Sequence, residues 1–329
     1  MKHSFNLPRI TTTLAVALVC LSGCAVNMKV PVKDPEPSVA TYTKTTETKP
    51  TALAFKDNRS EAEKATILSG RIPMQIVYND KPFDPVPWVA QHIVKEMAAR
   101  GLPVTLGDEQ SSTATVAITR IHIVNHRANG FSPFVTFTSV RADVLTDRGP
   151  QRITSYIKRG KVPVWTFDEV IDPTYNAPLD LVTKELAAKL NQQLFRQAIS
   201  DEEVNALIRK IDLGGDAADA YLDVYQLGFG NNPLAVSELV KLSSHANEYV
   251  RLAAISSLGI LKATDRYEFL TQIYENSTLM WQDRAMALKA IGDLGTPESH
   301  AYLEKQQSLL ERRRDKDATW VKQIIALYL

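Results

Sequence analysis

Apolar residues recur at spacings of three and four in two segments of the chain, which places them on one face of a helix. The first segment follows Pro85 and ends before Gly101, two residue types that are common at helix boundaries. The apolar positions are Val86, Val89, Ile93 and Met97 in the first segment, and Leu179, Val182, Leu186, Leu190 and Leu194 in the second. The pattern predicts amphipathic helices that start near residues 86 and 178.

Between these helices, three runs rich in β-branched residues predict strands over 115–124, 134–145 and 152–158. In the second run Val140, Ala142 and Val144 alternate with Arg141 and Asp143. A shorter apolar run over 51–55 predicts an earlier strand. The order strand, helix, three strands, helix indicates an α+β fold. We expect a mostly antiparallel sheet with two helices on one face.

Residues 1–23 have the features of a secretory signal: a basic start and an apolar run over 10–19 that is too short to span a bilayer. The signal ends in Leu21-Ser22-Gly23-Cys24, which resembles the lipobox of bacterial lipoproteins. The resemblance implies cleavage after Gly23 and acylation of Cys24. Several acyl chains would then hold the protein on a membrane.

The expected cleavage removes Cys20, so the mature chain keeps only the acylated cysteine and has no disulfide or free thiol. Ala25 follows this cysteine, where aspartate favours inner-membrane retention in enteric bacteria. We therefore expect the outer membrane, facing the periplasm, with inner-membrane retention and surface exposure left open. Residues 24–50, rich in proline, threonine and lysine, predict an acylated, mobile tether.

The turn Asp57-Asn58-Arg59 directly follows the first predicted strand. Together with the lipobox and the order of elements, it makes residues 51–200 similar to the small α/β domain of YajG-like outer-membrane lipoproteins. The resemblance implies a binding or assembly module, not an enzyme.

Residues 201–329 contain an internal repeat with an offset of 33 residues. The identical positions include Arg251 and Arg284, Ala254 and Ala287, Gly259 and Gly292. The pattern R-x-x-A-x-x-x-L-G-x-L resembles the HEAT family, which implies stacked helix pairs in an α-solenoid. We expect the alanine to permit close helix approach, the arginine to hydrogen-bond inside the stack, and the glycine to end each first helix in a left-handed cap.

The 329 residues include 38 lysines and arginines and 37 aspartates and glutamates, a formal net charge of +1. Hydrophobic residues make up 44% of the chain, which excludes wholesale disorder. The nearly balanced charge argues against nucleic acid as a partner.

Candidate catalytic groups are sparse. His122 and His126 fall in a predicted strand, where a separation of four residues is about 13 Å, too far to share one metal ion. Asp168, Glu169 and Asp172 could pair for acid–base chemistry, but a solvated loop is the favoured interpretation. We expect no metal, no cofactor and no enzymatic activity.

Two segments are candidate partner contacts. Phe131 and Phe134 lie in a predicted hairpin tip, where exposed aromatic side chains often mark a contact site. Arg312, Arg313 and Arg314 form a basic cluster, although flanking acidic residues favour a solvated helix end.

The sequence thus supports a lipid-anchored adaptor that binds protein partners of an envelope assembly. The alternative is a transport accessory that binds a lipid or another small ligand between helices and sheet.

Overall fold

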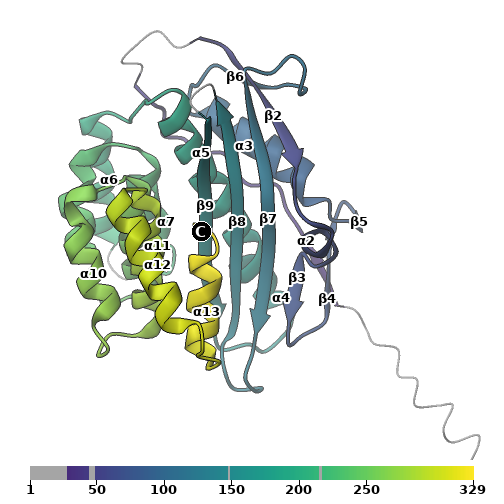
Figure 1. Ribbon diagram of the computed structural model, residues 1–329, viewed down its shortest axis with the longest axis vertical. Helices are drawn as coiled ribbons and strands as arrows, with labels where there is room; N and C mark the ends of the chain where they lie inside the picture. The colour runs from purple at the N-terminus through teal and green to yellow at the C-terminus, as the bar shows by residue number, and fades with distance from the viewer. Residues whose placement is uncertain (1–27, 44–48, 147–148, 215–216) are drawn as a thin grey trace, which may run out of the picture.

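The computed structural model describes residues 28–43, 49–146, 149–214 and 217–329 (Figure 1). The expected signal and the lipobox with Gly23 and Cys24 lie outside the described residues, so lipidation stays a prediction. Within the described residues the chain has an α+β fold: sheets and helices alternate up to residue 200, and helices follow. The predicted fold class is confirmed.

The main sheet has the strand order β6-β2-β7-β8-β9, and β3 pairs with the edge of β7 that also carries β2. Its strands are β2 (Thr51–Asp57), β3 (Leu68–Gly70), β6 (Val104–Leu106), β7 (Ala114–His126), β8 (Phe134–Thr146) and β9 (Gly149–Lys161). The long strands β7, β8 and β9 form the predicted antiparallel meander. The short strands β2, β3 and β6 join in parallel, because the intervening connections return the chain to the same end of the sheet.

Two long helices cover one face of this sheet, as predicted. They are α3 (Pro85–Ala99) and α5 (Ala177–Leu194). Alternate residues of β8 are buried, so the apolar set that begins at Val140 packs against α5. The acidic segment that was expected to be a loop is instead helical, as α4 (Asp168–Ile171) and the π-helical turn η1 (Asp172–Asn176), which run directly into α5.

The expected mobile tether is wrong for residues 28–43, which form an N-terminal strap along the folded body. Its first residues are β1 (Met28–Pro31), which joins β4 (Met74–Tyr78) and β5 (Lys81–Pro82) in a second sheet. The short helix α2 (Glu61–Ala65) packs against β7 of the main sheet. Val30 and Tyr42 are buried, and the Tyr42 hydroxyl donates to the Phe229 carbonyl at 2.8 Å. Proline enrichment suggested a free coil, but proline is tolerated where a strand lies at a sheet edge.

The C-terminal part consists of helix pairs that stack side by side. Its helices are α6 (Asp201–Gly214), α7 (Ala220–Phe229), η2 (Pro233–Ala235), α8 (Val236–Leu242), α9 (Glu248–Ile260), η3 (Thr264–Arg266), α10 (Tyr267–Glu275), α11 (Trp281–Leu294), α12 (Pro297–Leu310) and α13 (Lys316–Ile325). The first helices of successive pairs, α7, α9 and α11, pack against one another, and α13 packs on α11. The resemblance to HEAT repeats stays a prediction.

The repeat arginines and alanines behave as expected. Arg251 donates to the His245 carbonyl at 2.8 Å and pairs with Asp283 of the next repeat, while Arg284 donates to the Tyr274 carbonyl at 2.8 Å. Ala254 and Ala287 are fully buried between neighbouring helices.

The expected left-handed caps at Gly259 and Gly292 are wrong. Both glycines lie inside helices, where a Cβ on Gly259 would come within 2.6 Å of the Ala290 Cα and one on Gly292 within 2.6 Å of the Tyr328 ring. The left-handed residue falls three positions later in each repeat: Asn231, Lys262 and Gly295 have φ of 55°, 52° and 65°. The repeat glycine therefore permits close helix approach, and the turn comes after it.

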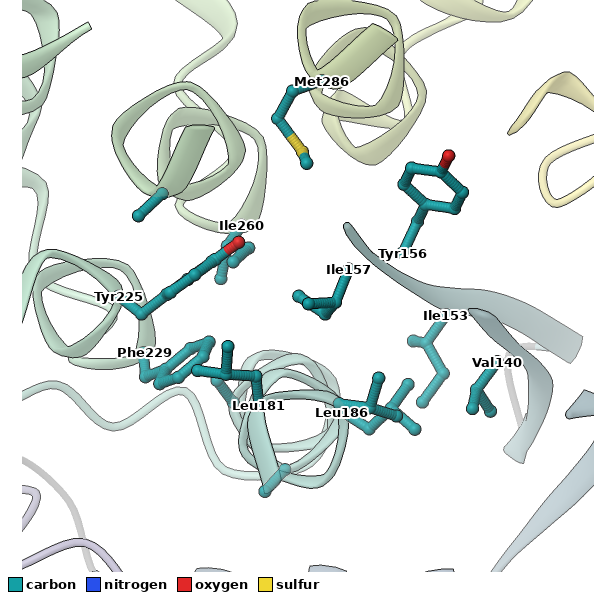
Figure 2. Close-up of a cluster of buried hydrophobic side chains, with 14 of the residues drawn as sticks. Val140, Ile153, Tyr156, Ile157, Leu181, Leu186, Tyr225, Phe229, Ile260 and Met286 are labelled. Atoms are coloured by element: carbon teal, nitrogen blue, oxygen red, sulfur yellow. The ribbon is translucent and has the colours of Figure 1, made fainter. Parts of the chain in front are cut away.

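One hydrophobic core runs across the expected boundary between residues 200 and 201. Figure 2 shows Ile157 of β9 lying among Leu186 of α5, Tyr225 of α7, Ile260 of α9 and Met286 of α11. The α+β part and the helical part are thus packed together as one body. The division into two domains, residues 51–200 and 201–329, stays a prediction.

None of the helices in the described ranges is long and apolar enough to cross a membrane.

Candidate functional site

A large open cavity lies where the helical part meets the outer face of the meander. It is a groove of about 970 Å³ between one end of β8 and β9, the N-terminal ends of α9 and α11, and α13. We call it the aromatic groove and define it by the six residues that matter below. They are Phe137, Lys158, Arg159, Tyr249, Trp281 and Trp320.

Three aromatic rings from three elements meet in this groove. The Trp281 and Trp320 ring centroids are 4.6 Å apart, and that of Phe137 on β8 lies 5.9 Å from the first and 4.8 Å from the second. Phe137 is buried, whereas both tryptophans are half-buried. The groove therefore offers apolar ring surface that the protein itself leaves partly open.

The groove also has a basic wall. The Arg159 guanidinium lies 3.9 Å from the ring centroids of both Tyr221 and Tyr249, so that it joins β9 to α7 and α9. Lys158 forms an ion pair with Glu248 at the start of α9. The Lys316 ammonium lies 4.3 Å from the Trp320 ring centroid. These contacts fix the cations along one side of the aromatic rings.

His126 stands at the edge of the groove, where burial and the nearby Lys316 and Arg71 lower its pKa below the ordinary value. The neutral ring accepts from the Lys316 ammonium at 3.1 Å. The nearby Ser132 hydroxyl donates to the Asn129 carbonyl at 2.8 Å and not to this histidine. The groove is suited to binding through ring contacts and charge.

The structure separates the two phenylalanines that the sequence grouped as contact residues. The Phe131 side chain is 98% exposed at the β7–β8 hairpin tip, but Phe134 is 1% exposed and packs against Phe167 and Tyr175. Phe134 is therefore a core residue. The reason is register: Phe134 begins β8 on the face that points toward η1.

Arg312, Arg313 and Arg314 are exposed in the connection between α12 and α13, outside the groove lining. Arg313 pairs with Asp315 at 2.8 Å. The position at a solvated helix end agrees with the favoured interpretation of the sequence.

The other candidate groups do not converge. The His122 ring shares a 2.9 Å hydrogen bond with Ser69, away from His126 and its lysine partner. Asp172 pairs with Lys33 of the strap at 2.8 Å, and this contact, with a hydrogen bond from Asn176, lowers the pKa of its carboxyl. Among the described residues no group of three or more His, Cys, Asp or Glu side chains is arranged to hold a metal ion.

A second junction between the two parts is made by buried charged side chains. Two helices contribute one cation and one carboxylate each, and we call these four residues the buried joint: Glu185 and Lys189 on α5, Lys289 and Asp293 on α11. The Lys289 ammonium lies 2.5 Å from Glu185 and 2.7 Å from Asp293, and Lys189 lies 2.7 Å and 2.6 Å from the same two carboxylates. All four residues are buried.

Within the buried joint, the neighbouring opposite charges favour the charged forms of Lys289 and Asp293. Burial alone would lower the pKa of Lys289, but Asp293 and Glu185 outweigh it and raise that pKa. Burial would likewise raise the pKa of Asp293, but Lys189 and Lys289 hold it below its ordinary value. Ser155 and Tyr328 add hydrogen bonds to the carboxylates at 2.7 Å and 2.9 Å. The site is balanced in charge and satisfied by its own partners, which is typical of a structural contact.

Sequence reasoning missed both junctions. Trp281, Trp320 and Lys158 are far apart in the chain, and their proximity depends on how the helices stack on the sheet. A usable signal existed: two of the chain's four tryptophans fall in the repeat region, where a solenoid core needs none.

No protein-family model matches the chain, and no curated protein does. Among solved structures, a minor lipoprotein from Acinetobacter baumannii is similar with a TM-score of 0.27 and 10% identity. A protein described as uncharacterized is similar with a TM-score of 0.30 and 10% identity. Each covers 47% of this chain and 99% of its own. At these TM-scores neither similarity supports a conclusion about this chain.

Proposed function

We propose that this chain is a non-catalytic, lipid-anchored protein of the bacterial envelope whose aromatic groove receives an apolar segment of a protein partner. The lipobox that ends at Cys24 supports the anchor, with the outer membrane, facing the periplasm, as its expected place. The repeat of helix pairs supports an adaptor role, since stacked helices present extended binding surfaces.

One observation carries the proposal: the open groove of about 970 Å³ with half-buried Trp281 and Trp320 on its floor. Tryptophan and tyrosine are enriched at the energetic centres of protein interfaces. Lys316 also lines the groove and is exposed, and its positive charge favours a segment with a carboxylate or with free backbone carbonyls.

Photo-crosslinking in cells tests this function. A photoreactive phenylalanine analogue replaces Gln282, which lines the groove, or Gln272, which is exposed on α10 outside it. Both positions are glutamines of the helical part, so the second is a matched control. We expect the groove position to capture one defined segment of one envelope protein, mapped by mass spectrometry. The same adduct should be lost when Trp281→Ala and Trp320→Ala are combined with it.

An adduct of equal yield from both positions, or one that survives the double tryptophan change, contradicts the proposal. So does a groove position that yields no adduct while the protein is folded and at its normal level.

A lipid acyl chain is the second candidate ligand, and the place of the groove favours it. The lining includes Ala128, Ser132 and Pro133 of the β7–β8 hairpin, at the end of the sheet where the chain leaves its anchor and enters β1. The same crosslinking experiment separates the two candidates, because a lipid adduct shifts the protein mass by one lipid and yields no peptide.

A further inference from the structure

The strap shortens the distance between the expected anchor and the folded body. β1 begins at Met28, only four residues after Cys24. Four residues of extended chain reach at most about 14 Å. If Cys24 is acylated, as the proposed function requires, the part of the body next to Met28 lies close to the membrane surface.

That part is one end of the main sheet. Met28 pairs with Met74 in the second sheet, and the Met74 sulfur accepts hydrogen bonds from Asn125 and from the Tyr175 hydroxyl. Asn125 is the residue before the last in β7. The chain therefore enters the folded body beside the β7–β8 hairpin, at the lower end of the sheet in Figure 1.

The same end carries the most exposed aromatic side chains. Phe131 at the hairpin tip is 98% exposed, and Trp165, four residues after β9 ends, is 81% exposed. Every other phenylalanine, tyrosine and tryptophan within the described ranges is buried or half-buried. β9 ends opposite Phe134, where β8 begins, so both exposed rings emerge from one end of the meander.

Basic side chains lie in the chain segments at this end of the molecule. The hairpin loop, residues 161–169 and residues 311–317 bring Arg127, Lys161, Arg312, Arg313, Arg314 and Lys316 to this end, and Arg71 reaches the loop by donating to the Ala128 carbonyl. Asp168, Glu169, Glu311, Asp315 and Asp317 lie in the same segments, where the cations outnumber them. The start of α13 lies next to the hairpin, as its Lys316 contact with His126 shows.

We propose that this end of the molecule docks on the lipid bilayer that holds the anchor, with Phe131 and Trp165 in the headgroup region and the basic side chains next to anionic lipids. The proposal rests on the acylation of Cys24 in the proposed function. Aromatic rings favour the interface between headgroups and acyl chains because they are apolar with a polarisable face. The acyl anchor then holds the protein at the bilayer, and the two exposed rings determine which end of the folded body faces it.

Depth-dependent quenching tests the orientation. The full acylated chain with Gly130→Cys is labelled with a fluorophore and reconstituted in vesicles of phosphatidylethanolamine and phosphatidylglycerol that contain nitroxide lipids. Nothing lies within 4 Å of a Cβ at Gly130, so the change leaves the hairpin intact. Leu106→Cys is the control, because Leu106 is 55% exposed at the opposite end of the sheet. Mass spectrometry first establishes the acyl chains on Cys24.

We expect strong quenching from position 130 and little from position 106, with a loss at position 130 when Phe131→Ser and Trp165→Ser are added. Equal quenching at both positions in an acylated protein overturns the docking surface and leaves the aromatic groove untouched. An unacylated Cys24 overturns the docking proposal together with the anchor on which it rests. Little quenching at both positions in an acylated protein also overturns the docking proposal, because this end is then free of the bilayer.

Discussion

The helical part meets the sheet part at two places that differ in almost every physical respect. At the buried joint, two cations and two carboxylates on α5 and α11 are buried and paired with one another. In the aromatic groove, rings and cations line an open cavity. A buried and paired contact contributes to the stability or orientation of the parts, whereas open apolar surface is available to another molecule. The comparison assigns stability to one junction and binding to the other.

The largest expected effect comes from breaking the buried joint. Lys289→Met leaves the buried carboxylates of Glu185 and Asp293 with a single cation, Lys189. We expect a loss of about 3–5 kcal/mol in the free energy of unfolding, as is common when one partner of a buried ion pair is removed. Denaturant unfolding followed by circular dichroism measures it.

Lys241→Met is the matched control for this substitution. Its side chain is 73% exposed and pairs with Glu238, and an exposed ion pair contributes about 0–1 kcal/mol. If both methionine variants unfold at the same denaturant concentration, the buried joint is not what holds the two parts together.

The next prediction tests how closely α9 and α11 approach each other beside the buried joint. Gly259→Ala would place a Cβ 2.6 Å from the Ala290 Cα, one residue after Lys289. Helix propensity alone predicts a gain of about 1 kcal/mol from this change. Crowding predicts a loss of roughly 1–3 kcal/mol, which we expect to prevail.

Gly214→Ala provides the comparison for propensity, because nothing lies within 4 Å of a Cβ there. A stabilised Gly259→Ala protein would mean that α9 and α11 do not approach as closely as the structure indicates.

A smaller effect is expected at the groove wall. Tyr249→Phe removes the hydroxyl that donates to the Gly160 carbonyl at 3.0 Å but keeps the ring on Arg159. We expect a loss of about 1 kcal/mol and unchanged crosslinking from position 282. A collapse of crosslinking in this variant would show that the hydroxyl, and not the ring surface, is what the ligand contacts.

The smallest effect is a pH dependence at the contact between strap and body. Burial tends to raise the pKa of Glu96, but Arg100 at 2.6 Å and hydrogen bonds from Ser38 outweigh it and lower that pKa. The stabilisation that the ionised Glu96 carboxylate provides is therefore complete above the pKa of an unfolded glutamate, about 4.3. It is lost as the pH falls through the lower pKa of Glu96 in the folded protein.

Glu96→Gln removes this titration. The difference in unfolding free energy between the native chain and this variant should shrink when the pH is lowered from 7 toward 3. A difference that stays constant across this range would mean that the Glu96 carboxylate does not titrate at a lowered pKa.

The sequence predicted most elements of the fold but not their contacts. The meander, α3, α5 and the repeated helix pairs follow from local periodicity, which depends on each segment alone. The strap was mistaken for a coil because Val30 and Tyr42 are isolated apolar residues in a proline-rich segment, and their burial depends on partners far along the chain. For the same reason the sequence could not tell exposed Phe131 from buried Phe134.

By itself the sequence indicated most of the helices and strands and the 33-residue repeat, and it predicts an anchor at Cys24, because each of these patterns depends on residues close together in the chain. Only the tertiary structure decided that Lys289 meets Glu185, that Trp281 and Trp320 share a groove with Phe137, and that β1 begins beside the hairpin. These contacts join residues far apart in the chain. They depend on the angle at which a stack of helices packs on a sheet, and no local pattern specifies that angle.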